Sequence, residues 1–323
     1  MVDTKFYMPI VVVSKCLEFE ACRWNSIVIS DLFIRRLQDH VIFKPICPEF
    51  EIGLGIPRDP IRIVAKGTNH HLIQPSSGRD LTSEMNDFST RYLDTLGPAD
   101  GFILKGRSPS CGIKDVKIHA GAKNAPVIGK GIGFFAQSVL EKHPYLAIED
   151  EGRLTNFRIR EHFLTRLFAL SALRYLHKKI SAGSLVRFHS KYKLLLMAYS
   201  RKEMKILGRL VANHQKAGLE KIAAEYDHHF KQALKAIPRF TSHINVLMHT
   251  MGYFSKQLSG KEKSHFLKLL DKYRIGKIPL SNPLSIIRSW IIRFDEQYLS
   301  DQVYFEPYPE DLSDFTDSGK AIA

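Results

Sequence analysis

The chain has 323 residues, a formal net charge of +14 and four cysteines. Four cysteines are too few for the disulfide scaffold of a secreted protein. No apolar run approaches the roughly eighteen residues that a membrane span needs. The amino-terminal residues also lack the basic and apolar regions of a signal peptide. We therefore expect a cytoplasmic protein with no membrane anchor.

Three short apolar runs predict strands in the first half of the chain. Residues 10–13, 41–43 and 101–104 are apolar, and the first two are rich in β-branched residues. Runs of this kind are typical of strands that are buried on both faces of a parallel sheet.

Helical and loop patterns lie between and after these runs. Residues 30–38 and 83–96 have the spacing of amphipathic helices, and another helix is predicted to begin near Phe134. The glycines and prolines of residues 53–60 predict a loop, and the three glycines of residues 129–133 predict a second loop. This alternation of strands and helices predicts an α/β domain with a parallel sheet.

From about Asn156 the pattern is mainly helical, so we expect an α/β domain over residues 1–160 and an all-α domain over residues 161–323. Residues 180–191 show no clear period, and the tail from Tyr304 is predicted to be extended and partly disordered. Helices are predicted at residues 157–179, 192–211, 219–237, 243–257, 260–273 and 283–298.

The positive charge belongs to one half of the chain. Residues 1–150 contain 18 Lys and Arg against 17 Asp and Glu, whereas residues 151–300 contain 28 against 10. The tail from Asp301 reverses the sign, because its six acidic residues are opposed by Lys320 alone. A basic domain joined to a neutral one predicts a polyanion-binding module, with nucleic acid favoured over membrane. The alternative is a solvated helical surface that is rich in lysine.

Three of the four cysteines follow the three predicted strands. Cys16, Cys47 and Cys111 each lie in a loop after a strand, and the carboxyl ends of parallel strands gather at one edge of a sheet. Their thiolates are therefore predicted to meet as a metal or iron–sulfur site with one open position. The alternative is that they are buried small hydrophobic residues. Cys22 lies only six residues after Cys16, and we expect it to have a structural or supporting role.

The residues around these cysteines form recognisable motifs. They are S-K-C-L at residues 14–17, C-R-W at 22–24, P-I-C-P-E at 45–49, G-L-G-I-P-R at 53–58 and K-G-R-S-P-S-C-G at 105–112. Together they resemble the TudS family of thiouracil desulfidases. One departure is the Trp-Asn-Ser sequence that follows the second cysteine, where the family has an aromatic residue followed by Asp-Gly.

The second half resembles a YbgA-type helical domain. The matching segments are residues 187–198, 207–213, 243–254 and 273–283. The fusion of the two resembles the RudS-type enzymes, which implies a desulfidase of 4-thiouridine in tRNA. Such an enzyme cleaves C=S hydrolytically to C=O and releases sulfide, so the resemblance implies an RNA-modifying hydrolase with tRNA as its partner.

The resemblance also implies a cofactor. We expect a 4Fe–4S cluster on Cys16, Cys47 and Cys111, with one iron left open. An open iron can bind the thiocarbonyl sulfur as a Lewis acid. Glu49, two residues after a ligand, is the candidate general base or acid.

Other residues of the motifs have candidate roles in this chemistry. Ser108 and Ser110 are expected to donate hydrogen bonds to the substrate or to the cluster sulfur. Basic residues close to the cysteines are expected to bind a phosphate or to offset the charge of the cluster. These candidates are Lys105, Arg107, Arg58 and Arg23.

Two other functions remain open at this point. The substrate is alternatively free thiouracil or a thiouridine nucleotide, with the helical domain serving assembly. From another class of protein, the chain is alternatively a non-catalytic RNA-binding protein with structural zinc on the same thiolates.

Overall fold

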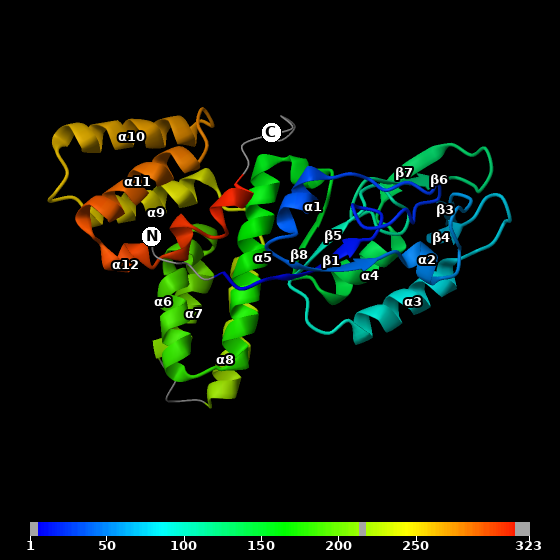
Figure 1. The fold of residues 1–323 in the computed structure, drawn as a ribbon, viewed down its shortest axis with the longest axis horizontal. Coiled ribbons are helices and arrows are strands. Elements are labelled where there is room, and N and C mark those ends of the chain that lie inside the picture. Colours follow the sequence, from blue (N-terminus) through cyan, green and yellow to red (C-terminus); the bar gives the residue numbers. More distant parts are fainter. Residues whose placement is uncertain (1–5, 213–217, 314–323) are drawn as a thin grey trace. The chain divides into compact units, whose positions relative to one another are not determined.

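The computed structural model describes residues 6–212 and 218–313, which divide into two units (Figure 1). One unit comprises Tyr7–Ser171 and the segment that begins at Pro309. The other is built on Ala172–Tyr308. The division therefore falls within helix α5 (Phe157–Lys178).

A parallel sheet with the strand order β2-β1-β5-β8 forms the centre of the first unit. Its strands are β1 (Ile10–Ser14), β2 (Ile42–Ile46), β5 (Gly101–Leu104) and β8 (Ala147–Asp150). The three strands predicted from apolar runs are confirmed, and so is the parallel α/β class. All residues of β5 and the last four of β1 are buried, as a strand covered on both faces requires.

A second sheet has the order β4-β3-β6-β7 and was not expected. Its strands are β3 (Arg62–Lys66), β4 (Asn69–Ile73), β6 (Val116–His119) and β7 (Val127–Gly131). The β3–β4 and β6–β7 pairs are antiparallel hairpins, and β3 joins β6 in parallel.

The predicted loop at residues 129–133 is wrong in its first half, because Gly129 and Gly131 belong to β7. A Cβ atom at Gly131 would lie 3.0 Å from a side-chain carbon of Ile118, so glycine here lets β7 approach β6 closely. Glycine marks close packing of two strands at this position, and the chain leaves the sheet only after Gly131.

Helices of the first unit connect and cover the sheets. They are α1 (Leu32–Leu37), α2 (Pro48–Glu51), α3 (Thr82–Thr95) and α4 (Phe134–Lys142), and a 3₁₀ turn at Arg153–Thr155 precedes α5. The helices predicted at residues 30–38, at 83–96 and from Phe134 are confirmed as α1, α3 and α4. Asp31 caps α1 by accepting a hydrogen bond from the Ile34 amide at 3.0 Å.

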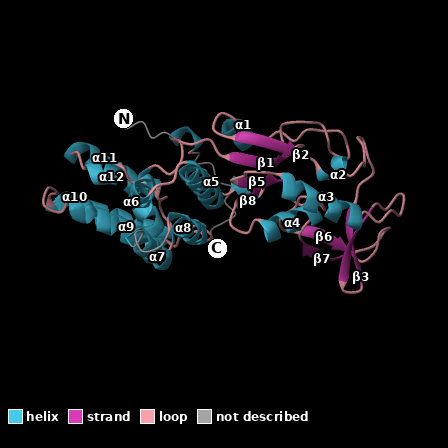
Figure 2. Cartoon of the chain, turned by 90° about the horizontal axis from the view of Figure 1, so that it is seen from below, coloured by secondary structure: helices cyan, strands magenta, loops and turns pink. Residues whose placement is uncertain are grey.

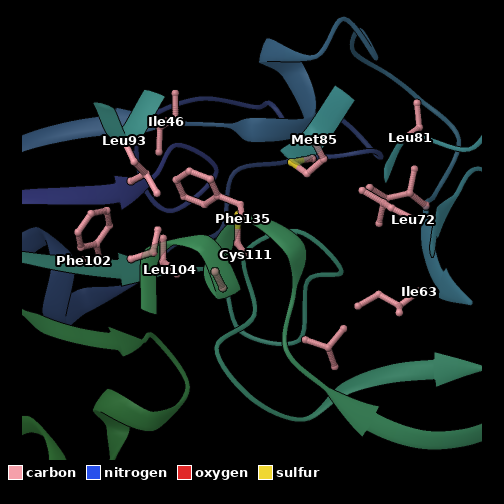
Figure 3. Packing of buried hydrophobic residues seen from close by; sticks show 14 of the residues in the cluster. Ile46, Ile63, Leu72, Leu81, Met85, Leu93, Phe102, Leu104, Cys111 and Phe135 are labelled. Carbon is pink, nitrogen blue, oxygen red and sulfur yellow. The ribbon is translucent and has the colours of Figure 1, made fainter. Parts of the chain in front are cut away.

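Residues from both sheets and from α3 and α4, elements that Figure 2 shows as a cartoon, form one hydrophobic core (Figure 3). Phe102 and Ile63 come from the two sheets, while Met85 and Phe135 come from the two helices. Cys111 is itself a member of this core. The third cysteine loop is therefore held by packing as well as by its backbone.

The second unit is helical, as predicted. Its elements after α5 are α6 (Ala182–Tyr199), α7 (Arg201–Ala212), α8 (Leu219–Ala233), α9 (Phe240–Tyr253), α10 (Gly260–Arg274), α11 (Ser281–Phe294), α12 (Gln297–Ser300) and the 3₁₀ turn Val303–Phe305. A further 3₁₀ turn, Glu310–Leu312, belongs to the first unit. Along the described residues, no helix is both long and apolar enough to cross a membrane.

Three features of this half differ from what the sequence led us to expect. Residues 180–191 are largely helical, because Ser181 and Ser184 form a capping box at which α6 begins. The apolar period is weak here because Leu185 is the one buried residue in the first half of α6. The predicted helix over residues 192–211 is two helices separated by Ser200. The tail is also more ordered than expected, since Tyr304, Phe305 and Tyr308 are buried. Residues 314–323 of the tail lie outside the described part.

Candidate functional site

A pocket of about 370 Å³ lies where β1, β2 and β5 end. All four cysteines line it, together with residues from each predicted motif. The lining residues are Ser14, Lys15, Cys16, Cys22, Arg23, Trp24, Ile46, Cys47, Pro48, Glu49, Arg58, Pro60, Ile61, Lys105, Gly106, Arg107, Ser108, Pro109 and Cys111. The parallel sheet therefore brings together segments that are almost a hundred residues apart in the sequence.

The four thiols are reduced and buried. Their residues are exposed by 8% at Cys16, 1% at Cys22, 8% at Cys47 and 5% at Cys111. The Cys22 thiol shares hydrogen bonds with the thiols of Cys16 and Cys47, and the Cys47 thiol donates to the Cys22 carbonyl at 3.7 Å. Cys22 is thus part of the same pocket wall, which its six-residue spacing from Cys16 did not indicate.

The surroundings of the Cys22, Cys47 and Cys111 thiols favour their protonated form. A hydrogen bond with Cys16, together with burial, raises the pKa of Cys22 to about 11. The hydrogen bond with Cys22, together with burial, raises the pKa of Cys47, and burial followed by the charge of Glu49 raises the pKa of Cys111. Ligands of a metal or cluster must be thiolates, so loading this site would release protons.

Glu49 and Arg58 form a buried ion pair across the pocket. The Arg58 guanidinium donates to Glu49 Oε2 from Nε at 3.0 Å and from Nη2 at 2.7 Å. Arg58 also donates to the carbonyls of Cys22 at 2.8 Å and Gly55 at 3.1 Å, and Nη2 lies 3.9 Å from Cys47 Sγ. Its side chain is 4% exposed. Arg58 therefore links the segments that contain Cys22 and Cys47 to the glycine-rich loop.

The two predicted serines contact the other carboxylate oxygen. Ser110 Oγ donates to Glu49 Oε1 at 3.0 Å, and Ser108 Oγ donates to the same atom at 3.4 Å. Ser108 Oγ also accepts from the amides of Ser110 and Cys111 at 3.2 and 3.1 Å, which fixes the turn before the third cysteine. Ser110 is fully buried and is not a lining residue, so it meets the pocket through Glu49.

The remaining predicted basic residues differ in their surroundings. Lys105 forms an ion pair with Glu151, and its amide donates to Ser14 Oγ at 2.8 Å. Arg107 is exposed, has a φ of +60°, and makes no ion pair in the part of the chain that the structure describes. Arg23 is half-buried and lines the pocket without a salt bridge among the described residues. Arg23 and Arg107 therefore remain available to a ligand.

Trp24 also lines the pocket, although no functional role was predicted for it from the sequence. It is 45% exposed, and its carbonyl accepts from the Arg58 amide at 3.1 Å. Two residues further on, Ser26 has a φ of +54°, in the left-handed region that glycine adopts readily. This backbone suits the glycine that the resemblance led us to expect at this position. An aromatic residue directly after Cys-Arg was the available signal for Trp24.

The donor set fits an iron–sulfur cluster. Four cysteines share one pocket, and the five basic lining residues outnumber the single acidic one, Glu49, so they can balance the negative charge of thiolates and sulfide. In residues 6–212 and 218–313, no group of three or more His, Cys, Asp or Glu side chains is placed to hold a metal ion. Cys16, Cys47 and Cys111 come from three separate loops, as the motifs suggested.

Two family models match separate parts of the chain. The model of the 2-thiouracil desulfurase family matches residues 11–151. The model of a family described as protein of unknown function, DUF1722, matches residues 193–309. The solved structure of a [4Fe-4S]-dependent thiouracil desulfidase, TudS, is similar with 25% identity and a TM-score of 0.36, over 45% of this chain and 93% of that one.

Two curated relatives each match part of the chain. The chain is 35% identical over 154 residues to the uncharacterized protein YbgA of Escherichia coli strain K12, which covers 47% of this chain and 91% of YbgA. It is 32% identical over 110 residues to the uncharacterized protein YbbK of Bacillus subtilis strain 168, which covers 32% of this chain and 72% of YbbK. The chain therefore belongs to the 2-thiouracil desulfurase family through residues 11–151 and to the YbgA-like DUF1722 family through residues 193–309.

Proposed function

We propose that the protein is an iron–sulfur-dependent desulfidase that converts 4-thiouridine in tRNA to uridine. Membership of the 2-thiouracil desulfurase family supports desulfidation of a thiopyrimidine. The observation that carries the proposal is the pocket itself, which is lined by three cysteines from three loops and by one carboxylate, that of Glu49. The basic helical half supports a polyanionic substrate.

A 4Fe–4S cluster held by Cys16, Cys47 and Cys111 would supply an iron that binds and polarises the thiocarbonyl group. The chain itself provides the charge balance for such a group. Arg58 lies against Cys47 Sγ, and a cation at this place favours a thiolate. Burial alone would lower the pKa of Arg58, but Glu49 raises it, so the guanidinium keeps its charge.

Proton transfer is the task that Glu49 can perform. Replacing C=S by C=O consumes one water and releases one sulfide as H₂S, so two protons must move from the water to the sulfur. The anchoring of Oε2 by Arg58 leaves Oε1 to exchange protons with water or with the Ser108 hydroxyl. A carboxylate that is positioned in this way is suited to general base and general acid catalysis in turn.

Recognition of the base falls to the exposed side chains of the pocket. Trp24 presents an apolar ring on which a pyrimidine can stack, and Arg107 and Arg23 are available for the phosphates on either side. Because the sulfur of a folded RNA lies within a base stack, the modified nucleotide has to turn out of the stack to reach the pocket.

The helical unit provides a surface for the rest of the RNA. Residues 151–300 have 28 basic against 10 acidic residues, and α7 exposes four basic side chains. These are Arg201, Lys202, Lys205 and Arg209. An exposed basic helix binds phosphates without reading sequence.

The deciding experiment compares two substrates. Protein purified without air should release sulfide from tRNA that contains 4-thiouridine, and kcat/KM for this tRNA should exceed kcat/KM for free 4-thiouridine monophosphate. Activity on the free nucleotide but not on the tRNA would show that the substrate is a small molecule. A colourless protein with zinc and no desulfidase activity would support an RNA-binding protein with structural zinc instead.

A further inference from the structure

The near-neutral charge of the first 150 residues conceals a local excess of basic residues. Residues 105–133 contain six Lys and Arg and one acidic residue, Asp115, while the rest of residues 1–150 contains 12 basic against 16 acidic residues. Four of the six lie at positions 114–130, which comprise β6, β7 and the segments that flank β6. We call residues 114–130 the lysine hairpin, after Lys114, Lys117, Lys123 and Lys130.

All four lysines of the hairpin are exposed. Lys130 lies 3.3 Å from Asp115, whereas the other three make no ion pair within the described part of the chain. Lys117 and Lys130 are direct cross-strand partners, so their side chains leave the same face of the sheet. Two like charges at opposite positions of a sheet destabilise it, and an anion bound between them would remove the repulsion.

Protection of a sheet edge does not account for these lysines. The strand β7 is at the edge of its sheet, and lysine is a usual means of preventing such an edge from pairing with another chain. However, Lys130 is the single lysine on β7. Lys117 lies on β6, which is paired on both sides, and Lys114 and Lys123 lie outside the strands.

The base of the hairpin is fixed to the third cysteine loop. The Gly133 amide donates to the Gly112 carbonyl at 2.8 Å, and the Phe134 amide donates to the Pro109 carbonyl at 3.1 Å. A Cβ atom at Gly133 would lie 2.6 Å from the Ser110 backbone, so glycine is required for this approach. A ligand that is bound to the hairpin is therefore held at a constant position relative to Ser110 and Cys111.

We propose that the lysine hairpin binds the phosphate backbone of the RNA substrate, so that the desulfidase unit holds RNA by itself as well as through the basic helices. This inference rests on the proposed function and names a partner for a second surface. A mononucleotide presents one phosphate group, whereas the lysines lie before β6, on both strands and in the turn between them. A chain of phosphates matches this distribution. Exposed Val127 and Ile128 beside the lysines offer apolar contacts to sugars.

The test uses the full-length chain and a triple variant, Lys114→Gln with Lys117→Gln and Lys123→Gln. Binding of 4-thiouridine tRNA should weaken about tenfold or more, and the slope of log affinity against log salt should become less negative by about two to three, because up to three phosphate contacts are lost. Iron content and kcat/KM for free 4-thiouridine monophosphate should not change.

The matched control removes the same number of charges from elsewhere in the unit. Arg79→Gln, Arg91→Gln and Lys142→Gln are exposed positions outside the hairpin, and their combination should leave the affinity and the salt slope near those of the unmodified protein. Equal losses in the two triple variants would overturn the inference, as would an unchanged salt slope in the hairpin variant. Failure of the proposed function would give a different result, because the unmodified protein would then bind tRNA without releasing sulfide from it.

Discussion

Each oxygen of the Glu49 carboxylate has its own set of donors. Arg58 occupies Oε2, and the hydroxyls of Ser108 and Ser110 occupy Oε1. The ion pair fixes the orientation of the carboxylate, while the hydroxyl side is the part that can exchange protons. Under the proposed function, the pocket therefore separates a positioning contact of Glu49 from a reactive one within a single side chain.

If Glu49 moves protons, Glu49→Gln should reduce turnover by roughly 10²–10⁴, as is typical of positioned acid–base groups. The amide oxygen of Gln can still accept from Arg58, so iron content and tRNA binding should stay close to normal. Glu51→Gln is the matched control, because Glu51 lies on the same short helix but is exposed and does not line the pocket. Full turnover of the Glu49 variant in single-turnover assays would remove this residue from the chemistry.

The cysteines allow a second prediction at this scale. Anaerobically purified protein should be brown and should contain about four irons per chain. Cys16→Ser, Cys47→Ser and Cys111→Ser should each lose iron and activity together, as iron and sulfide analyses would show. Cys22→Ser should lose less of both, since it removes hydrogen bonds to two thiols and no predicted ligand. Loss of all iron from the Cys22 variant would assign it to the ligand set.

The positions of the predicted ligands followed from local patterns, but the contacts between side chains did not. A cysteine directly after an apolar run reaches the edge of a parallel sheet whatever the details of its loop. The contact of Arg58 with Glu49 depends on the path of residues 50–58, where no periodicity constrains the backbone. Cys22 returns to Cys16 because residues 15–20 form a turn, closed by the Glu20 amide and the Lys15 carbonyl at 2.9 Å.

Among the elements, the second sheet and the break between α6 and α7 were missed for different reasons. The strand β4 contains Asn69, His70 and His71, and β7 contains two glycines, so neither resembles a strand of branched apolar residues. Ser200 lies inside a run with helical spacing, and apolar periodicity continues across it. Local hydrogen bonds determine both the strands of the second sheet and the break at Ser200, and such bonds cannot be predicted from a pattern of apolar residues.

Ser200 ends α6 and caps α7. Its backbone is extended, with a φ of −153°, and its hydroxyl accepts from the Glu203 amide at 3.3 Å. Ser200→Ala should therefore destabilise the helical unit by about 1 kcal/mol, as loss of a helix cap does. Urea denaturation followed by circular dichroism measures this change. Ser200→Asn retains a capping group, and an equal loss in that variant would mean that the cap contributes nothing.

The packing of α6 against α8 makes the helical unit sensitive to acid. His189 Nδ1 lies 3.2 Å from the Tyr226 hydroxyl, and burial, with a smaller effect of Lys193, lowers the pKa of His189 to about 4. In the unfolded chain the pKa of histidine is about 6.5. Below that pH the unfolded chain binds a proton that the folded unit does not, so stability is complete above about pH 6.5 and decreases as the pH falls towards 4.

We expect His189 to account for about 1–3 kcal/mol of stability lost between about pH 7.5 and pH 4.5. Urea denaturation at both pH values measures the total loss in the unmodified chain. His189→Gln keeps a group that can bond to Tyr226 but does not titrate, so its loss should be smaller by this amount. Equal pH dependence in the two proteins would exclude His189 as the acid-sensitive group.

For the whole molecule, the sequence predicted the change from α/β to helical structure and the side that carries the charge. The structural class and the net charge of each half are averages over more than a hundred residues, so a wrong boundary at a single helix or strand changes them little. The assignment of basic charge to the helical half alone was too coarse, because a near-zero sum over residues 1–150 hides the lysine hairpin. A total charge does not reveal how the charges are distributed over a surface.

The charge of the helical half leads to a prediction for RNA binding. Lys202→Glu with Lys205→Glu reverses two exposed charges on α7, and it should weaken tRNA binding and its salt dependence, because fewer counterions are released. Iron content and activity on a free nucleotide should be preserved. Lys202→Arg with Lys205→Arg keeps the charge and serves as the control in filter-binding or anisotropy titrations. Salt-independent tRNA binding by the unmodified chain would show that the basic helices do not contact phosphates.

The spread of the pocket cysteines along the chain has a consequence for biosynthesis. Cys16 and Cys111 are separated by 95 residues, which a ribosome adds in about 5–20 seconds at its usual rate. During that interval the first thiols have no pocket to bury them, although in the finished protein each is exposed by 8% or less. Until Cys111 has been added, the first thiols are therefore more accessible to oxidants and stray metal ions than they are in the folded protein.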